Sequence, residues 1–391
     1  MSGLEPTHLS FLLACLRVDP ARPEKVRALL ESGLDWEALV ALASQHGLLP
    51  LVYTCLREDA PGLAPEPVLA RLQELYTQNG LRNLRMAKRL IQIITLFEQA
   101  GIVFLPVKGL VMALQAYGDL NSRSFVDLDL LIKPGDLPEA LEILQSIGYL
   151  PSVPIQPDQL PWLQRGNIEL QLRRADQYLD LHWDLIGERL GHFPKDRFTW
   201  QDHSQLSLLG KEIPTLSLEN TLLYLCLHGA KHAWQPLSTV ADLSHFLARQ
   251  PELDWQVSAG AAERYGMRRV FGLGLRLAQQ WSHVALPTEM ERFTAGADVQ
   301  HLAERVQRCW FAAPGEESRL AEESFQLLCQ DNLPAQLYYT FNLVFVPQPA
   351  DRQALPLPLW LDPLYYLLRP ARLVLKYGKE ALRRLKSLSC K

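Results

Sequence analysis

Two aspartates, one residue apart, interrupt an otherwise apolar run in "RSFVDLDLLIKP", residues 123–134. The alternation of apolar residues with Asp127 and Asp129 predicts a short β-strand with one buried face. Residues two apart on a strand point to the same side, so the two carboxylates lie together. Two ionised carboxylates repel each other unless a cation lies between them, and burying them unpaired is costly. The sequence therefore predicts a strand that carries a cation site; solvated aspartates on an edge strand are the alternative.

The segments around this strand follow the order of an α/β unit. "IVFLPVKG" predicts a strand before it, "LVMALQAYGD" a helix between the two, and "DLPEALEILQSIGYL" a helix after it. Further on, "NIELQLR" and "QYLDLHWDL" both alternate and are separated by "RADQ", which predicts an antiparallel hairpin. On its second strand Asp180 and His182 share the polar face, whereas Trp183 belongs to the apolar face and is expected to pack in the core.

Helical periodicity dominates both flanks of this unit. Before it, apolar residues recur at three- and four-residue steps, with Asp35 at an N-cap position and Gly101 at the end of a long helix. After it, Ser217 opens the helical pattern of "SLENTLLYLCLHGAKHAW". We therefore expect an α+β fold with a small mixed sheet between helical flanks. The expected regions are an N-terminal helical region (1–100), the core (101–190), a helical domain (191–350) and a basic amphipathic segment (351–391).

Composition narrows the class of protein. Of the 391 residues, 48% are hydrophobic and 21% are charged, as in a globular protein with a substantial core. The net charge of −4 gives no general case for a nucleic-acid partner. The six cysteines have no metal-like spacing, the first residues lack a basic leader, and no long apolar stretch is free of charge and proline. These features predict reduced thiols, no signal peptide, no membrane span and a cytoplasmic location.

The paired aspartates suit a hard, oxygen-seeking cation. Mg²⁺ is commonly held by one or two carboxylates, with substrate phosphates completing its shell. A third acid from a neighbouring strand would let the site hold two ions, which catalyse in-line displacement at phosphorus. Asp180 is the predicted third acid because it lies on the polar face of the hairpin, and Glu169 is the substitute candidate. His182 is expected to support the metal ligands from outside.

A glycine at the preceding strand-to-helix junction suits a phosphate. Gly109 follows the predicted strand "FLPVKG" directly. Such a glycine lets a phosphate approach the backbone amides and the positive end of the helix. The order strand, glycine, helix, strand with two aspartates, helix and acid on a later strand is more specific than any of its parts.

The motifs in this order resemble a known family. "LPVKGLVMALQAYGDLNSRSFVDLDLLIKPGDLPEALEILQSIGYL", followed by "LDLHWDL" and "LCLHGAKHAWQPLSTVADLSHFL", is similar to the uncharacterised nucleotidyltransferase family of the DNA polymerase β-like superfamily. The resemblance covers roughly residues 35 to 250. It rests on a Lys-Gly turn, a Tyr-Gly-Asp, an Arg before the paired aspartates, an Asp-x-His-Trp strand and a helical His-Gly-x-Lys-His.

The resemblance implies a nucleotidyltransferase core and roles for its residues. Asp127, Asp129 and Asp180 would be the catalytic acids that bind Mg²⁺ or Mn²⁺, and Gly109 the phosphate-turn glycine. The reaction would move a nucleoside monophosphate from a triphosphate, with ATP as the expected donor, to an acceptor hydroxyl, and pyrophosphate would leave. The residues expected to bind the nucleotide, in part by giving charge to phosphate oxygens, are Lys108, Gly109 and Arg123.

Several alternatives stay open at this point. The superfamily usually has a second Gly or a Ser after the turn glycine, whereas Leu110 stands here, and the spacing from Gly109 to Asp127 is longer than usual. A catalytically inactive nucleotide-binding or scaffold protein is therefore the second hypothesis. The acceptor is either a small molecule or a peptide or protein, for which the helical flanks would form a groove.

Two histidines four residues apart share one face of the helix at 217–234. His228 and His232 have the spacing of zinc ligands, but the glutamate of HExxH and a third ligand are missing. The sequence favours either ordinary packing or a helix face that lines the cleft and contacts the nucleotide, with Lys231 reaching a phosphate. Asp242 is expected to cap or pair with this helix.

The last segment mixes apolar and basic residues. It is predicted to be a solvated amphipathic helix packed on the domain, or to contact an anionic membrane surface or a protein partner. Aromatic residues are too few for a nucleic-acid surface to be favoured. From residue 363 on, its basic residues are Arg369, Arg372, Lys376, Lys379, Arg383, Arg384, Lys386 and Lys391.

Overall fold

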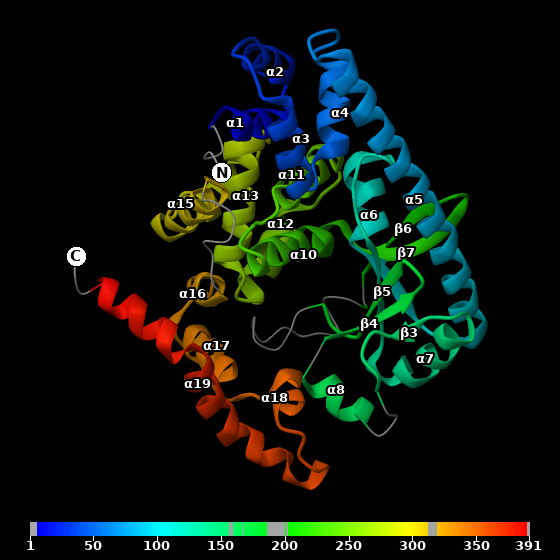
Figure 1. Cartoon of the computed structure of the whole chain (residues 1–391), viewed down its shortest axis with the longest axis vertical. Coiled ribbons are helices and arrows are strands. Elements are labelled where there is room, and N and C mark those ends of the chain that lie inside the picture. The colour runs from blue at the N-terminus through cyan, green and yellow to red at the C-terminus, as the bar shows by residue number, and fades with distance from the viewer. Residues whose placement is uncertain are drawn as a thin grey trace.

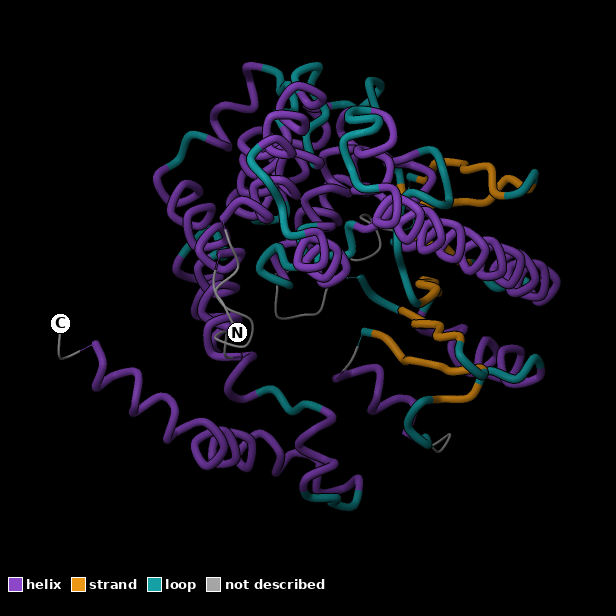
Figure 2. Tube along the Cα trace, turned by 45° about the horizontal axis from the view of Figure 1, so that its top comes forward, coloured by secondary structure: helices purple, strands orange, loops and turns teal. Residues whose placement is uncertain are grey.

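The computed structural model describes residues 6–155, 159–166, 168–185, 200, 202–311 and 319–388. Helices make up most of it, and a five-stranded sheet lies beside the long helix α5 (Glu66–Ala100), as Figures 1 and 2 show. The protein is α+β, as the sequence predicts. Cys390 and Lys391 lie outside the described residues.

The sheet mixes parallel and antiparallel pairs in the order β1-β2-β5-β4-β3. β2 (Asp127–Ile132) lies between β1 (Phe104–Val107), to which it is antiparallel, and β5 (Gln177–His182), to which it is parallel. β4 (Glu169–Arg174) pairs antiparallel with both β5 and β3 (Leu150–Pro151). The predicted strand and hairpin are therefore confirmed. Because β2 is an interior strand, the edge-strand alternative is wrong.

One face of this sheet packs against helices. Leu128, Leu130 and Leu181 are buried in a core with side chains of α5 and of α7 (Leu137–Ser146). Leu130 is 0% exposed, so its whole side chain is removed from water. α5 ends at Gly101, whose φ of 72° is a left-handed conformation that glycine adopts without a side-chain clash. The alternation that buries the leucines leaves the aspartates of β2 on the opposite face.

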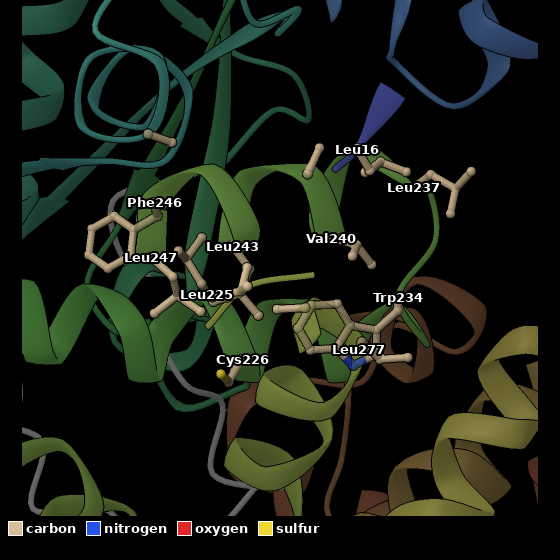
Figure 3. Close-up of a cluster of buried hydrophobic side chains, with 14 of the residues drawn as sticks. Leu16, Leu225, Cys226, Trp234, Leu237, Val240, Leu243, Phe246, Leu247 and Leu277 are labelled. Atoms are coloured by element: carbon tan, nitrogen blue, oxygen red, sulfur yellow. The ribbon is translucent and has the colours of Figure 1, made fainter. Parts of the chain in front are cut away.

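A second core joins the N-terminal helices to the helices after residue 217. Figure 3 shows part of it, a cluster of buried side chains that extends from Phe246 through Leu243 to Trp234. Trp234 lies against Gly229, where a Cβ would come within 2.7 Å of the indole ring. The helices that contribute to this core include α1 (Pro6–Cys15), α2 (Arg22–Glu31), α3 (Trp36–Gln45), α4 (Leu49–Glu58), α10 (Leu218–Lys231), α11 (Ser238–Arg249), α12 (Trp255–Arg264), α13 (Arg268–Ser282), α14 (Glu291–Thr294) and α15 (Ala297–Phe311).

The predicted helix starts are confirmed where a side chain caps them. The carboxylate of Asp35 accepts a hydrogen bond from the backbone N–H of Ala38 at 3.1 Å, which satisfies an otherwise unpaired amide at the start of α3. The hydroxyl oxygen of Ser217 accepts from the backbone N–H of Asn220 at 3.2 Å and starts α10.

A two-stranded hairpin lies within the region that the sequence predicts to be helical. β6 (His203–Leu208) and β7 (Lys211–Leu216) are antiparallel, and Thr215 Oγ1 donates to the carbonyl oxygen of Pro106 in β1 at 3.1 Å. The turn between them places Leu209 at φ 51° and Gly210 at φ 82°. The prediction missed this hairpin because a leucine is an unusual first residue for a turn with two left-handed positions. The remaining short elements are η2 (Pro134–Asp136), α8 (Leu160–Gly166) and η5 (Thr288–Met290).

The C-terminal helices form a separate group along the edge of the molecule (Figure 1). α16 (Arg319–Leu328) leads into α17 (Leu333–Phe345) and α18 (Pro349–Ala354), and the 3-10 helix η6 (Leu359–Leu364) runs into α19 (Tyr365–Leu388). In Figures 1 and 2 the end of α19 projects away from the other helices. Among the described residues, none of the helices has both the length and the apolar character needed to cross a bilayer.

Candidate functional site

The parallel pair of β2 and β5 brings the predicted acids together. Asp129 stands opposite Asp180 in the register of the two strands, so both side chains lie on the same face of the sheet. Ligand atoms of Asp129, Asp180 and His182 lie within 4.8 Å of one another. In the described part of the chain this is the one group of acids, histidines or cysteines close enough to hold a metal ion. Asp127 lies two residues earlier on the same face of β2.

Asp129 is the most deeply buried of these acids, with a side chain only 3% exposed. Lys108 Nζ donates to its Oδ1 at 2.8 Å, and His182 Nε2 lies 2.9 Å from the same oxygen. Burial by itself would raise the pKa of Asp129, but Lys108 and His182 hold it well below its ordinary value. The carboxylate is therefore ionised and has partners already.

Lys108 occupies the junction between β1 and the following helix. It has a positive φ of 50°, and the helix starts directly after it with α6 (Gly109–Met112) and continues as the π-helical turn η1 (Ala113–Tyr117). Burial favours the neutral amine, but Tyr224 and Asp129 raise the pKa of Lys108 above its usual value. The lysine is predicted to bind phosphate; in this structure its ammonium group neutralises Asp129.

The two other acids are less well neutralised. Burial, followed by the charges of Asp129 and Asp180, raises the pKa of Asp127 to about 6. Burial and the charge of Asp129 likewise raise the pKa of Asp180, whose Oδ1 accepts a hydrogen bond from Gln171 Nε2 at 3.2 Å. The face of the sheet that carries Asp127, Asp129 and Asp180, here called the acid face, thus holds more negative charge than the neighbouring cationic side chains balance. This favours the binding of a further cation.

Glu169, the substitute candidate for the third acid, lies behind His182. Its Oε2 is 3.1 Å from His182 Nδ1, although this ring nitrogen has no well-aligned hydrogen bond. Glu169 stands opposite His182 in the register of β4 and β5. His182 therefore lies between Glu169 and Asp129, and its ring also belongs to the group close enough to hold an ion, so its support of a metal ligand from outside stays a prediction. The role of Glu169 as a ligand remains a prediction.

Arg123 lies just before β2, and its charge is already paired. Its guanidinium group binds both carboxylate oxygens of Asp242 in α11 at 2.9 to 3.0 Å, and the hydroxyl of Tyr117 donates to Asp242 at 3.0 Å. The prediction that Asp242 caps or pairs with the helix of His228 is wrong, because its carboxylate binds residues that precede β2. A buried bidentate pair fixes the position of a guanidinium group.

The segment between η1 and β2 accounts for the long spacing after Gly109. Two asparagines of α5 hold it: Asn83 Nδ2 donates to the carbonyl oxygens of Leu120 and Arg123 at 2.6 and 2.8 Å, and Asn79 Nδ2 donates to the latter at 3.0 Å. Both asparagines are buried. The extra residues therefore form an anchored segment that brings Arg123 to the site.

The histidine face of α10 lies beside the acids. His228 lines the same cavity as Asp129, and burial and the charge of Lys108 hold the pKa of His228 well below its usual value. Burial lowers the pKa of His232 to about 4, and the rings of the two histidines lie 4.8 Å apart. Burial also lowers the pKa of Lys231. Within the described residues neither histidine belongs to a metal-binding group, so the structure gives no support to a zinc site.

Tyr224 is a site residue that the prediction missed. It is one turn before His228 on α10, and it lies close enough to Lys108 for a hydrogen bond between their side chains. Burial raises the pKa of Tyr224 to about 12, although Lys108 acts in the opposite direction. The four-residue spacing from His228 was the available signal, since residues four apart share a helix face.

A cavity of about 740 Å³ opens beside the acids. Lys108, Gly109, Arg123, Asp127 and Asp129 line one side of it. The other side comes from the N-terminal helices, which the sequence analysis assigned no chemistry. Its polar contributors include Ser44 and Gln45 of α3 and Tyr76, Gln78, Asn79 and Arg82 of α5.

The sequence establishes the family to which this fold and site belong. The model of a family described as "Uncharacterised nucleotidyltransferase" matches residues 32–283, well over half of the chain. The protein belongs to this nucleotidyltransferase family, which confirms the resemblance and the class of enzyme that it implies. No curated protein matches the sequence.

Three solved structures are similar over part of the chain. The antibiotic-resistance factor ANT(2'')-Ia has a TM-score of 0.34 and 11% identity, covering 46% of this chain and 92% of that chain. The lincosamide antibiotic adenylyltransferase LnuA, in its lincomycin-bound crystal structure, has a TM-score of 0.26 and 23% identity, covering 35% and 83%. An antigenic nucleotidyltransferase-like protein from Paracoccidioides brasiliensis has a TM-score of 0.29 and 17% identity, covering 57% and 98%.

Proposed function

We propose that the protein transfers a nucleoside monophosphate from ATP to a hydroxyl group of an acceptor and releases pyrophosphate. The observation that carries the proposal is the register of β2 and β5, which sets Asp129 opposite Asp180 with Asp127 nearby. Asp127 and Asp129 of this group line a cavity of about 740 Å³, within the range of about 300 to 1,000 Å³ usual for ligand sites.

The donor set fits Mg²⁺ or Mn²⁺. Asp127, Asp129 and Asp180 offer carboxylate oxygens, which hard divalent cations prefer, and burial together with the charges of Asp129 and Asp180 raises the pKa of Asp127. His182 is occupied with Asp129 and is better suited to orient that carboxylate than to bind the ion. The bound ion would supply charge that stabilises phosphate oxygens as pyrophosphate leaves.

Lys108 would change partners when substrate binds. Its ammonium group now neutralises Asp129, and a cation held by the acids would replace that interaction. The freed ammonium group would then bind phosphate oxygens beside Gly109, whose backbone lines the same cavity. Arg123, fixed in position by its ion pair with Asp242, would contact phosphate oxygens on the same side, and Lys231 and the two histidines would contact the nucleotide from α10.

Asp180 is the residue that we assign to the acceptor. Its carboxylate is half-buried, and a single hydrogen bond from Gln171 positions it. A carboxylate at this place would orient the acceptor hydroxyl and accept its proton. The N-terminal helices that form the far wall of the cavity would select the acceptor, which is a small molecule or a hydroxyl group of a peptide or protein.

The test is pyrophosphate release from each of the four nucleoside triphosphates with Mg²⁺ or Mn²⁺ and a panel of hydroxyl acceptors. We expect release with ATP, and its loss in Asp127→Asn combined with Asp129→Asn. Asp176→Asn, at the exposed β4–β5 turn, is the matched control and should behave like the wild type. Equal pyrophosphate release by the double variant and the wild type would overturn the assignment of these acids.

The second candidate function is nucleotide binding without turnover. The observation that favours it is Leu110, which is 3% exposed and packs in the core under the sheet, where the superfamily usually has a small residue after the turn glycine. Equilibrium binding of ATP in the presence of Mg²⁺, with no pyrophosphate released in any mixture, would favour this function over catalysis.

A further inference from the structure

Helix α19 turns its apolar side outward. Leu364 at the end of η6 and Leu367, Leu368, Val374 and Leu375 in α19 recur at three-, four- and seven-residue steps, so they share one face. All five are exposed, Leu367 to 74% and Leu375 to 84%. A helix of a globular protein normally turns such a stripe toward the core. This outward stripe needs a partner.

The opposite side of α19 is held by a buried charge. Arg369 is 2% exposed; its Nη1 donates to Asp351 at 2.7 Å, and its Nε and Nη2 donate to the carbonyl oxygen of Leu343 at 3.1 and 2.8 Å. Arg372 also binds Asp351, and Tyr365 is 1% exposed. Breaking a buried ion pair is strongly destabilising, so this side cannot easily exchange with the leucines. The pair therefore fixes the apolar stripe on the outside.

The neighbouring elements add further exposed apolar side chains. On α17 the residues Leu333, Leu337, Phe341 and Phe345 recur every four residues, and all are exposed. Trp360 in η6 is 77% exposed. Of the twenty-one exposed large hydrophobic side chains in the described residues, twelve lie between residues 333 and 375. Exposed apolar surface concentrated in this way marks an interaction site.

The charge of the same segment identifies the partner. The whole chain carries a net charge of −4, yet residues 376–391 contain six lysines and arginines and a single glutamate. The partner must therefore accept both an apolar stripe and a basic segment. A bilayer of anionic lipids does so, because its surface attracts basic residues and its interior accepts apolar side chains. Tryptophan and tyrosine favour the interface between water and the bilayer interior, and Trp360 and Tyr366 would lie at this interface.

We propose that α19 and the adjoining η6 bind flat on the surface of an anionic lipid bilayer. An apolar groove of about 290 Å³ beside the stripe, lined in part by Leu355, Leu368 and Leu375, offers space for part of an acyl chain. The helix does not cross the bilayer, since only one of its faces is apolar. This binding is independent of the nucleotidyltransferase reaction and would place the enzyme at a membrane surface.

Flotation of the full chain with vesicles tests the proposal. We expect the protein to float with phosphatidylcholine vesicles that contain phosphatidylglycerol, to float far less with phosphatidylcholine alone, and to detach as salt is raised. Leu367→Glu combined with Leu375→Glu should lower partitioning at least about tenfold, because two leucine side chains that would enter the bilayer are lost and negative charge is added. Both sites are exposed, so the thermal unfolding curve should not change.

Leu63→Glu combined with Leu81→Glu is the matched control. These leucines are 46% and 51% exposed and lie outside the C-terminal helices, so this variant should float like the wild type. Failure of the wild type to float, or equal flotation with and without phosphatidylglycerol, would overturn the proposal. Concentration-dependent dimerisation in place of flotation, lost in Leu367→Glu with Leu375→Glu, would also overturn it and identify a second copy as the partner. Pyrophosphate assays are not needed for any of these outcomes.

Discussion

Successive residues of β2 point to opposite faces of the five-stranded sheet, and the two faces have different surroundings. On one face Leu128 and Leu130 meet the helices α5 and α7 and leave water completely or nearly so. On the other, Asp127 and Asp129 meet acids, a lysine and a histidine beside a cavity. Each apolar contact stabilises the fold by itself, whereas the protonation state of each acid depends on the charges of its neighbours. The comparison teaches that stability and chemistry are separable within a single strand.

The largest expected effect lies on the acid face. Asp180→Asn preserves the shape of the side chain and removes the charge assigned to the acceptor hydroxyl, so pyrophosphate release should fall about 10³-fold. Because Asp180 is only half-buried and carries an unfavourable charge, the free energy of unfolding should not fall. Denaturant titration beside the activity assay checks both. An inactive variant that is also strongly destabilised would contradict the separation of the two faces.

The counterpart on the apolar face is Leu130→Ala. Removing a fully buried leucine side chain should lower the free energy of unfolding by about 3 kcal/mol. The folded fraction should keep its activity, measured at a temperature well below the unfolding transition. Val126→Ala, directly before β2 and 63% exposed, is the matched control and should change stability little. Loss of activity in a folded Leu130→Ala protein would show that the faces are coupled.

The pH dependence of stability should reveal the crowding of acids. The pKa of Asp127 is raised to about 6 in the folded protein, against an unfolded value of about 3.9. The folded state therefore binds this proton more readily, so Asp127 alone should add about 1 to 2 kcal/mol to the free energy of unfolding of metal-free protein as pH falls from about 7.5 to about 5. Histidines such as His228 and His232, whose pKa values are lowered, reduce stability over the same range, so the contribution of Asp127 is read as a difference between wild type and variant. Asp129, whose pKa is lowered, loses its contribution only below about pH 4.

Asp127→Asn isolates this effect. Denaturant titrations in a chelator at the two pH values should show that acidification changes the stability of the variant less favourably than that of the wild type, by about 1 to 2 kcal/mol. The change that remains in the variant belongs to Asp180, whose pKa is also raised, and to the two histidines, whose pKa values are lowered. An equal change in both proteins would show that the pKa of Asp127 is not raised by burial and the neighbouring acids.

The smallest effect is expected at the rim of the acid face. Gln171 is exposed and makes one hydrogen bond of 3.2 Å to Asp180. Gln171→Ala should lower the rate of pyrophosphate release by about two- to tenfold, since a single hydrogen bond contributes about 0.5 to 1.5 kcal/mol. Stability should be unchanged. A loss as large as that of Asp180→Asn would mean that the glutamine, and not only the carboxylate, determines the rate.

The sequence was informative where local patterns decide the structure. Two-residue alternation identified β2, β4 and β5, and side-chain caps identified the starts of α3 and α10. The convergence of Asp129 and Asp180 on one face followed from the same alternation. The register that sets them directly opposite each other required the structure, because strand pairing between distant segments is not fixed by either segment alone.

Long-range contacts account for what the sequence did not reveal. Arg123 and Asp242 are 119 residues apart, and nothing local to either one indicates their pairing. The cavity wall formed by Tyr76 and Arg82 depends on how α5 passes the sheet, which is a property of tertiary packing. The turn at Leu209 hid the β6–β7 hairpin because an exposed leucine stands at a left-handed position where glycine or asparagine is usual.

The division of the cavity between strands and helices has an evolutionary consequence. The carboxylates lie on β2 and β5, whereas Tyr76, Asn79 and Arg82 lie on a helix that precedes the core. Substituting Tyr76 or Arg82 would change this wall, while the register of β2 and β5 keeps Asp129 opposite Asp180. What the cavity accepts can thus vary without any change to the strands that carry the acids.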